Sequence, residues 1–418
     1  MATIHPEPNP LSMIPFAALL TTLALAPMLA PRQWHRHCPK ICVGFAGITI
    51  AYYLLALHSG WRILHSGRDY ASFIIVVGGF FIVTAGIHLQ VRGRATPAHN
   101  TLFLLVGALL GNVLGTVAAS SLLIRPWIAV NRHRIAPFHI AFFIFAVSNI
   151  GGVLLPIGPP LLLGYLKGVP FWWVAQRCWL PWSITLGAVL IIFYLVDRFH
   201  SRRAASETPA GEKWQCAGGP NFIVMAAMLG CLVMLPAGWR ELSIAVIATA
   251  SFWFTPAEIR QRNEFSFAPL KEIAWIFLGI FATLIPVLDY MERHAADLGL
   301  HSDTQFYWTT GALSAVLDNA PAYLAFLSAA LGLHGFSIEN TADLSQFLAR
   351  HAHLLVAISL GATCFGAFTY IGNGPNLLVK AIADHAGVKT PSFFGFILKF
   401  ALPVLLPIFA LVSFLFFR

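Results

Sequence analysis

The sequence predicts an all-α polytopic membrane protein built from two inverted repeats, each with five transmembrane helices, a re-entrant hairpin and a broken helix. Three observations lead to this fold class. Apolar stretches long enough to cross a bilayer recur along the whole chain. Each half contains two long apolar segments that are interrupted by glycine, proline or small polar residues. The elements follow the same order in both halves.

The composition agrees with a membrane protein. Of the 418 residues, 58% are hydrophobic and only 10% are charged, against about 25% charged residues in an ordinary soluble domain. The net charge of +9 is explained by basic cytoplasmic loops, so we do not expect nucleic acid as a partner. One polar interval, 200–219, is typical of a linker and separates a first repeat, 1–199, from a second repeat, 220–418.

The first apolar stretch, 11–30, has no Lys or Arg before it. Because a cleavable signal peptide needs such a basic region, we expect this stretch to remain as a membrane helix. Residues 31–40 follow it and indicate a basic loop at the membrane surface. The other uninterrupted stretches are 41–58, 70–89 and 180–198 in the first half, and 220–239, a short 241–255, 270–290 and 393–417 in the second.

Two segments, about 101–130 and about 306–333, are interrupted near their middle. Each arm has about a dozen apolar residues, too few to cross about 30 Å of hydrocarbon at about 1.5 Å per residue. A re-entrant hairpin fits better, since two half-helices can meet at a small, polar tip and return to the same side. A shift of 199 residues places Ser120 in the first tip on Asn319 in the second.

The hairpins determine the predicted topology. If they do not cross the membrane, each half has five crossings, an odd number, so the second half is inverted relative to the first. With the N-terminus outside, 17 of the 26 Lys and Arg residues fall in cytoplasmic segments, which include the 200–219 linker. This bias supports the orientation.

Two further segments, about 138–166 and about 351–383, are long enough for a membrane helix but contain a break. The second break, TYIGNGPN at 369–376, combines glycine, proline and asparagine, which end helices. Aligning Pro156-Ile157-Gly158 with Tyr370-Ile371-Gly372 makes the two breaks counterparts. In hydrocarbon a break must be buried in protein or line a polar cavity. Freed carbonyls can hold a cation and half-helix N-termini an anion, so the four motifs predict a transport site rather than structural kinks.

These motifs resemble the signature segments of a known family. The segments are GTVAASSLLIRP (115–126), SNIGGVLLPIGPPLLLGYLKG (148–168), LDNAPAYL (317–324) and TYIGNGPNLLVKAIA (369–383), and they are similar to those of the bacterial putative citrate transport family. That family belongs to the ion transporter superfamily, which also contains sodium/proton antiporters, divalent anion/sodium symporters and arsenite carriers. The resemblance covers most of the chain from about residue 70 and is more specific for the superfamily than for a substrate. It implies inverted repeats with a sodium site in each, a multi-pass protein of the bacterial inner membrane, and often a homodimer.

The resemblance also implies two sets of binding residues, one in each repeat. The first set is Ser120, Ser121, Asn149, Gly151 and Gly152, and the second is Asp318, Asn319, Thr369, Asn373 and Asn376. Within the second set, Asp318, Asn319 and Asn373 would hold sodium. Family members carry Gly-Asp-Pro-Pro in the first break, whereas this chain reads Gly158-Pro159-Pro160. The first site therefore either binds its ion through carbonyls and hydroxyls alone or has lost it.

Two ionisable residues, Asp318 and Lys399, are candidates for coupling sodium movement to proton movement. Near the bilayer midplane the Asp318 carboxylate could hold sodium, accept a proton, or do each in turn. Its structural alternative, capping the returning half-helix, is compatible with these roles. Lys399 either snorkels to the cytoplasmic surface or pairs with a buried carboxylate such as Asp318 as a second coupling residue. Asp289 and His139 lie near predicted span ends, where we expect interfacial side chains.

Together these features predict a secondary active transporter that couples sodium and proton movement. Sodium/proton antiport is placed ahead of sodium- or proton-coupled uptake of citrate or another di- or tricarboxylate, because no Arg lies at the breaks or tips to clamp carboxylates. Half-helix N-termini can still bind an anion, which keeps the second hypothesis open. An intramembrane enzyme is a remote alternative, since the spans show no nucleophile–base pair. No cofactor is expected, and the partners are the lipid bilayer and small inorganic or carboxylate ions, with sodium as the coupling ion.

Overall fold

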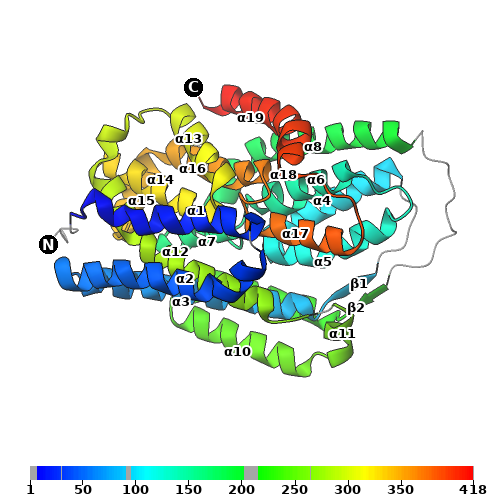
Figure 1. Ribbon diagram of the computed structural model, residues 1–418, viewed down its shortest axis with the longest axis horizontal. Coiled ribbons are helices and arrows are strands. Elements are labelled where there is room, and N and C mark those ends of the chain that lie inside the picture. Colours follow the sequence, from blue (N-terminus) through cyan, green and yellow to red (C-terminus); the bar gives the residue numbers. More distant parts are fainter. Residues whose placement is uncertain (1–6, 30, 91–95, 202–214, 264, 418) are drawn as a thin grey trace.

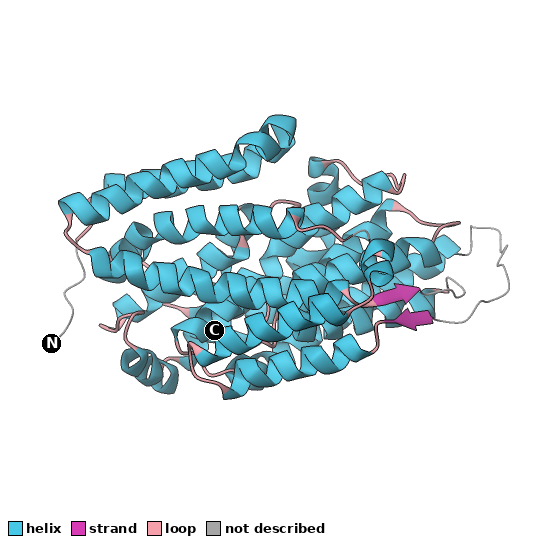
Figure 2. Ribbon diagram, turned by 90° about the horizontal axis from the view of Figure 1, so that it is seen from below, coloured by secondary structure: helices cyan, strands magenta, loops and turns pink. Residues whose placement is uncertain are grey.

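The computed structural model describes residues 7–29, 31–90, 96–201, 215–263 and 265–417. Most of these residues lie in helices, and the longer helices run roughly along one axis of the molecule (Figure 1). A view turned by 90° shows the same bundle with one pair of short strands at one end (Figure 2). The prediction of an all-helical fold is confirmed at this level.

The first half begins with three helices, α1 (Ile14–Leu29), α2 (Pro31–Ala51) and α3 (Gly60–Ala85). A 3₁₀ turn, Pro10–Met13, precedes α1, and a π-helical turn, Tyr52–Ala56, follows α2. α1 and α2 pack against each other and against α12 (Ala268–Arg293) of the second half. After α3 the chain forms the strand β1 (His88–Gln90).

The prediction of a loop at 31–40 is wrong, because α2 begins at Pro31. The reason is an apolar stripe that a count of charges does not reveal. Trp34, Cys38 and Cys42 follow one another at a spacing of four residues, are buried, and pack with Leu19 of α1 and Ile280 of α12. Exposed basic residues on the opposite face, such as Arg36 and Lys40, give the segment its polar composition.

The next two helices form a hairpin. α4 (Pro97–Leu114) and α5 (Thr116–Val130) are separated only by Gly115, whose φ of 80° lies in a region that favours glycine. Asn100 near the start of α4 donates a hydrogen bond of 2.8 Å to Asn131, directly after α5, so the chain reverses at Gly115. α4 is longer than the apolar run predicts because Thr96 caps it and Pro97 opens it.

The first broken helix follows. α6 (Pro137–Phe143) continues into a π-helical turn, Ile144–Asn149, and a short 3₁₀ turn, Ile150–Gly152. Non-helical backbone then leads to α7 (Pro159–Lys167). Every residue from 138 to 153 is buried, so this break lies in the interior of the protein. The half ends with the long helix α8 (Trp173–Ser201).

Most of the predicted 200–219 linker, 202–214, lies outside the described residues. Its end forms β2 (Gln215–Ala217), which pairs antiparallel with β1. The second half then continues with α9 (Pro220–Met234), α10 (Trp239–Phe254), the short α11 (Ala257–Arg262) and α12.

A second helical hairpin consists of α13 (Asp303–Val316) and α14 (Asn319–Leu333). A short 3₁₀ turn, Ala295–Leu298, precedes it. Phe306 of α13 and Phe326 of α14 lie with ring centroids 6.4 Å apart, which requires the chain to reverse between the two helices. The tip is at Leu317 and Asp318.

The second broken helix starts with α16 (Ala352–Phe365) and a 3₁₀ turn, Gly366–Phe368. Non-helical residues then lead to α17 (Gly374–His385). Residues 357–370 are all buried, as in the first break. The chain ends with α18 (Phe393–Phe396), a π-helical turn, Ile397–Ala401, and α19 (Leu402–Phe416).

The helix α15 (Thr341–Arg350), like the short α11, was not predicted from the apolar pattern. It buries only Leu344, Phe347 and Leu348 and exposes much of its remaining surface, so its sequence is amphipathic rather than apolar. It meets α16 at an angle of 99°.

The two hairpins lie at opposite ends of the molecule. Figure 1 shows α4, α5 and α6 toward the end that carries β1 and β2, and α13, α14 and α15 toward the other end. Each hairpin also packs on the broken helix of the other half: α5 contacts α17, and α14 contacts α7. The two halves therefore meet through their hairpins and breaks.

Six helical segments among the described residues have the length and apolar character of a membrane span, or seven if the bent segment 341–368 is included. The six are Arg36–Ala56, Gly60–Ala85, Pro97–Leu114, Trp173–Ser201, Ala268–Arg293 and Phe393–Phe416. This number is smaller than the ten crossings that the sequence predicts, and it includes α4, whose 18 residues make it longer than the hairpin arm that the sequence predicts as too short to cross. Part of the difference lies in α9 and α10, whose 15 and 16 residues correspond to about 24 Å, less than the thickness of the hydrocarbon core.

Candidate functional site

Three buried asparagines connect the two breaks. Asn149, Asn373 and Asn376 are at most 4% exposed. Asn149 Nδ2 donates to Asn376 Oδ1 at 2.8 Å, and Asn373 Nδ2 donates to Asn149 Oδ1 at 3.0 Å. Residues more than 220 positions apart in the sequence thus share one hydrogen-bonded cluster, which we call the amide cluster.

The amide cluster also replaces backbone hydrogen bonds that the breaks remove. Asn376 Nδ2 donates to the carbonyls of Gly366 and Thr369, both at 2.8 Å. Asn149 Nδ2 donates to the carbonyl of Ile144 at 2.9 Å, and Asn373 Nδ2 donates to that of Ser148 at 2.9 Å. Buried carbonyls need such partners because an unpaired one costs about 1–3 kcal/mol.

The first hairpin contacts the first break near the amide cluster. Ser120 Oγ lies 2.8 Å from Ser148 Oγ, and both side chains are buried. Close approach here requires glycine. A Cβ at Gly151 would lie 2.7 Å from Ala108 Cα, and one at Gly152 would lie 2.4 Å from Thr116 Cγ2.

The second hairpin contacts the second break in a similar way. The side-chain amide of Asn319, with its nitrogen toward the surrounding acceptors, donates to the carbonyls of Gly372 at 2.7 Å and Ala362 at 3.1 Å. Thr369 Oγ1 donates to the carbonyl of Ala315 at 2.7 Å and accepts from the N–H of Gly372 at 2.9 Å. The breaks and hairpin tips therefore form one connected polar network.

Contacts in the two halves correspond under the sequence shifts. A shift of 199 residues carries Ser120 to Asn319, and the 214-residue shift between the breaks carries Ser148 to Ala362. The Ser120–Ser148 contact thus corresponds to the Asn319–Ala362 contact. The same 214-residue shift carries Gly158 to Gly372 and Gly152 to Gly366. A Cβ added at Gly158 would lie 3.8 Å from the carbonyl oxygen of Gly152, and one added at Gly372 would lie 2.8 Å from that of Gly366.

Asp318 begins α14 and caps it. Its carboxylate accepts a hydrogen bond of 3.2 Å from the N–H of Ala320, and its side chain is partly buried. Within the described part of the chain it forms no ion pair. The capping role expected as the structural alternative is thus present, and the carboxylate retains further acceptor capacity beside the network.

Two predicted site residues lie apart from the network. Ser121 is partly buried and has no side-chain hydrogen bond to any residue that the structure describes. Lys399 is exposed in the π-helical turn before α19 and, among the described residues, forms no ion pair with Asp318. Its position agrees with a side chain that extends toward the surface.

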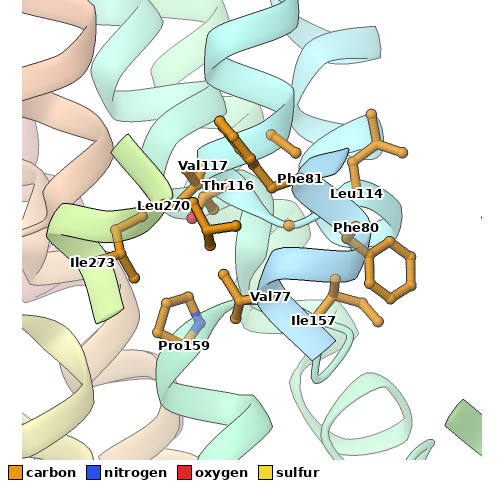
Figure 3. A pocket seen from close by; sticks show the side chains of 12 residues that line it. Val77, Phe80, Phe81, Leu114, Thr116, Val117, Ile157, Pro159, Leu270 and Ile273 are labelled. Carbon is orange, nitrogen blue, oxygen red and sulfur yellow. The ribbon is translucent and has the colours of Figure 1, made fainter. Parts of the chain in front are cut away.

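A small hollow lies at the tip of the first hairpin. It is bordered by α3, the start of α5, the start of α7 and α12. Figure 3 shows its apolar lining, with Val77 of α3, Ile157 and Pro159 of the break, and Ile273 of α12 around it. The Thr116 side chain at the start of α5 adds a hydroxyl.

Comparison with known families identifies the chain. A family model described as "Putative citrate transport" matches residues 7–417. The chain belongs to this family. The match begins earlier than residue 70, where the sequence resemblance becomes recognisable. No curated protein matches the chain.

As a member of the putative citrate transport family, the protein is a multi-pass membrane transporter. The amide cluster joins its two halves, and each hairpin packs on the broken helix of the other half. Transporters often bind their substrates and coupling ions at such a contact, where broken helices expose backbone groups.

The structure also shows buried ionisable residues that the sequence did not single out. Asp289, expected at the interface, is 1% exposed and pairs with Arg62 of α3, while Tyr53 donates to it at 2.7 Å. His139, expected at the surface, is fully buried against Asp197 of α8. The only signal in the sequence was the presence of ionisable residues within otherwise apolar stretches.

Proposed function

We propose that the protein is a secondary active transporter that couples sodium and proton movement, acting as a sodium/proton antiporter. One observation carries this proposal. Asp318 is the single acidic residue in the four break and tip motifs, and it lies next to Asn319, which contacts the second break. A partly buried carboxylate that is not neutralised by a described cation can bind sodium or a proton in alternation.

The sodium ligands would come from the second repeat. Asp318 would supply a carboxylate, and the side-chain amides of Asn319 and Asn373 would supply neutral oxygen ligands. Hard cations such as sodium prefer oxygen ligands. The first repeat offers Ser120, the Asn149 amide and the backbone of the Gly158-Pro159-Pro160 segment instead. We therefore assign the principal cation site to the second repeat.

The architecture proposed for this transport is two inverted repeats. Three observations support it. Contacts in the two halves correspond, each hairpin packs on the broken helix of the other half, and the two hairpins lie at opposite ends of the molecule (Figure 1). In such an arrangement, one half can move against the other around a fixed site, which gives alternating access.

Coupled uptake of citrate or another carboxylate is the second candidate. The family description favours it. The N-termini of α5 and α7 also border the hollow of Figure 3, and helix N-termini attract anions. Against it, the hollow is mostly apolar, and no Lys or Arg of the described part of the chain lines it.

Transport in proteoliposomes tests the proposal. A sodium gradient should drive proton movement without any added organic anion, and Asp318→Asn should abolish this movement. Asp297→Asn provides a matched control, because the Asp297 side chain is 77% exposed. If protons move only when citrate or succinate is present, and the labelled anion moves with them, the second candidate replaces the first.

A further inference from the structure

A second polar cluster lies at the base of the first hairpin, away from its tip. We call it the hairpin-base cluster, and it contains Asn100 of α4, Arg134 in the turn after α5, His139 of α6 and Asp197 of α8. Asn100, His139 and Asp197 are at most 1% exposed. Arg134 is partly exposed and lies near the exposed residues Arg132 and His133, so the cluster reaches the surface of the protein at this edge.

Asp197 is the centre of this cluster. Its Oδ2 accepts hydrogen bonds from Asn100 Nδ2 at 2.9 Å and from Arg134. Its Oδ1 faces His139 Nε2 at 3.2 Å. The carboxylate therefore lies between a guanidinium and an imidazole.

If the hairpin-base cluster served only to hold its helices together, we would expect its buried polar atoms to be hydrogen-bonded, and several of them are not. Eight buried side-chain nitrogen or oxygen atoms among the described residues have no hydrogen bond of good geometry, and five of them are here. Three are Asn100 Oδ1, Arg134 Nε and Arg134 Nη1, and the other two, His139 Nε2 and Asp197 Oδ1, face each other at 3.2 Å without the geometry of a hydrogen bond. Because unsatisfied buried polar atoms are rare and costly, their concentration at one place indicates a role beyond packing.

The backbone determines the protonation state of His139. The N–H of Ala136, the residue that caps α6, donates to His139 Nδ1 at 3.1 Å. Nδ1 therefore carries no proton, and the proton of the neutral ring is on Nε2, which faces Asp197. An imidazolium has a proton on both nitrogens, so a second proton on Nδ1 would remove the acceptor for Ala136.

The side chains that surround His139 determine which other groups near it could bind a proton. His200 of α8 lies with its ring centroid 5.9 Å away, and the rings of Trp127 and Phe193 complete the enclosure. α17 and the turn before α19 also pack against α6. Their ionisable side chains are Lys380 and Asp384, which pair with each other, and the exposed His385 and Lys399.

The start of α6 is linked to the amide cluster through a short stretch of chain. α6 runs directly into the π-helical turn that carries Ser148 and Asn149. Within this turn Asn149 Nδ2 donates to the carbonyl of Ile144, the first residue of the turn. An α6 that has lost its cap would hold the first break less firmly.

We propose that His139 is a proton-sensing residue, which binds a proton from the side of the membrane that carries the β1–β2 strands, releases the N-terminus of α6, and thereby slows transport as that side is acidified. The effect on transport rests on the proposed function. The release of α6 does not, because it depends only on the contacts of His139.

Two substitutions separate the states of His139. His139→Gln cannot be protonated, and glutamine at this helix position can still accept from the capping N–H. His139→Arg carries a permanent charge and has no acceptor. His200→Gln is the matched control, since it removes the neighbouring imidazole, which contacts the Arg134 carbonyl, and leaves His139 unchanged.

The first measurement is the hydrogen exchange of the backbone amides of α6 in the purified protein between pH 8 and pH 5, corrected for the intrinsic effect of pH. We expect these amides in the wild type and in His200→Gln to exchange roughly fivefold faster at pH 5, the equivalent of losing a cap of about 1 kcal/mol. His139→Gln should stay protected throughout, and His139→Arg should exchange fast throughout. Equal behaviour of the wild type and His139→Gln would overturn the proposal.

The second measurement is sodium-driven proton movement in proteoliposomes over the same range of pH. Dividing the wild-type rate by the His139→Gln rate removes the effect of the proton as a substrate, and this ratio should fall as the pH decreases. A constant ratio would overturn the control of transport by His139. If no variant transports protons, the proposed function fails, while hydrogen exchange still decides whether His139 releases α6.

Discussion

The amide cluster is the residue-scale feature that holds the two breaks together. Each of its three side chains has a partner in the other half of the chain, and their nitrogen atoms satisfy carbonyls freed by the breaks. An amide can do both because it donates two hydrogen bonds and accepts at its oxygen. A carboxylate at the same place would face carbonyl oxygens without donors.

Replacement of Asn149 tests this role. In Asn149→Ala, Asn376 Oδ1 loses the donor at 2.8 Å and Asn373 Nδ2 loses the acceptor at 3.0 Å. We expect the free energy of unfolding to fall by about 2–4 kcal/mol, because buried polar atoms are left with fewer partners. Thermal unfolding in detergent measures this loss. Ser121→Ala is the control and should change stability by less than about 0.5 kcal/mol; equal losses in the two variants would contradict the prediction.

Individual site residues could be predicted from the sequence only where the residues next to them are unusual for an apolar segment. Asn373 and Asn376 stand out because they lie among glycine and proline in an apolar segment. Their pairing with Asn149 depends on how the halves fold together, which local sequence does not contain. The burial of His139 could not be predicted for the same reason, since its partner Asp197 is 58 positions away, in α8.

At the scale of elements, glycine permits each hairpin tip to lie against a break. A Cβ at Gly372 would lie 2.8 Å from the carbonyl oxygen of Gly366 and 2.9 Å from that of Ser314. These are backbone atoms, so neither can move away without shifting the hairpin or the break. At Gly374, two residues later, an added Cβ would have no atom of the described residues within 4 Å beyond its immediate neighbours.

This difference yields opposite predictions within one motif. Gly372→Ala should destabilise the protein by about 1–3 kcal/mol through overpacking and should slow transport, because the tip that carries Asp318 and Asn319 is displaced. Gly374→Ala lies in the first turn of α17 and should leave stability unchanged or raise it by up to about 1 kcal/mol. Melting temperatures and initial transport rates of the two variants check this. A Gly372→Ala protein as stable and active as Gly374→Ala would show that the contact is not tight.

Elements could be predicted where apolar length and helix-breaking residues agree. Irregular backbone near residues 153–158 and 369–373 follows from glycine and proline in otherwise apolar segments. The helical start of α2 and the whole of α15 were missed because both are amphipathic, and a count of apolar residues does not detect a helix that is apolar on one face only. The ends of α4 depend on caps rather than on hydropathy.

At the scale of the whole molecule, buried charges connect the halves at the end opposite β1 and β2. Glu339, in the turn before α15, lies 2.6 Å from Arg62 of α3 and 2.7 Å from Lys167 at the end of α7. Lys167 also lies 2.8 Å from Asp69 of α3. These contacts join helices of the first half to the α14–α15 turn of the second. Together with the hairpin-base cluster, they place a buried ionic network at each end of the transporter.

Glu339 makes the stability of this end dependent on pH. Burial alone would raise the pKa of Glu339, but the charges of Lys167 and Arg62 outweigh it and lower the pKa from 4.5 to about 2. A carboxylate with a lowered pKa contributes stability above its ordinary pKa and loses it as the pH falls toward the folded value. Glu339→Gln should therefore melt at a lower temperature than the wild type at pH 7, because Arg62 and Lys167 each lose one of two carboxylate partners and keep only Asp289 or Asp69. The difference should shrink between about pH 4.5 and pH 2 as the wild-type carboxylate becomes protonated. Glu258→Gln, at an exposed position of α11, should follow the wild type at every pH. A difference that stays constant down to pH 2 would show that Glu339 does not stabilise the protein through its charge.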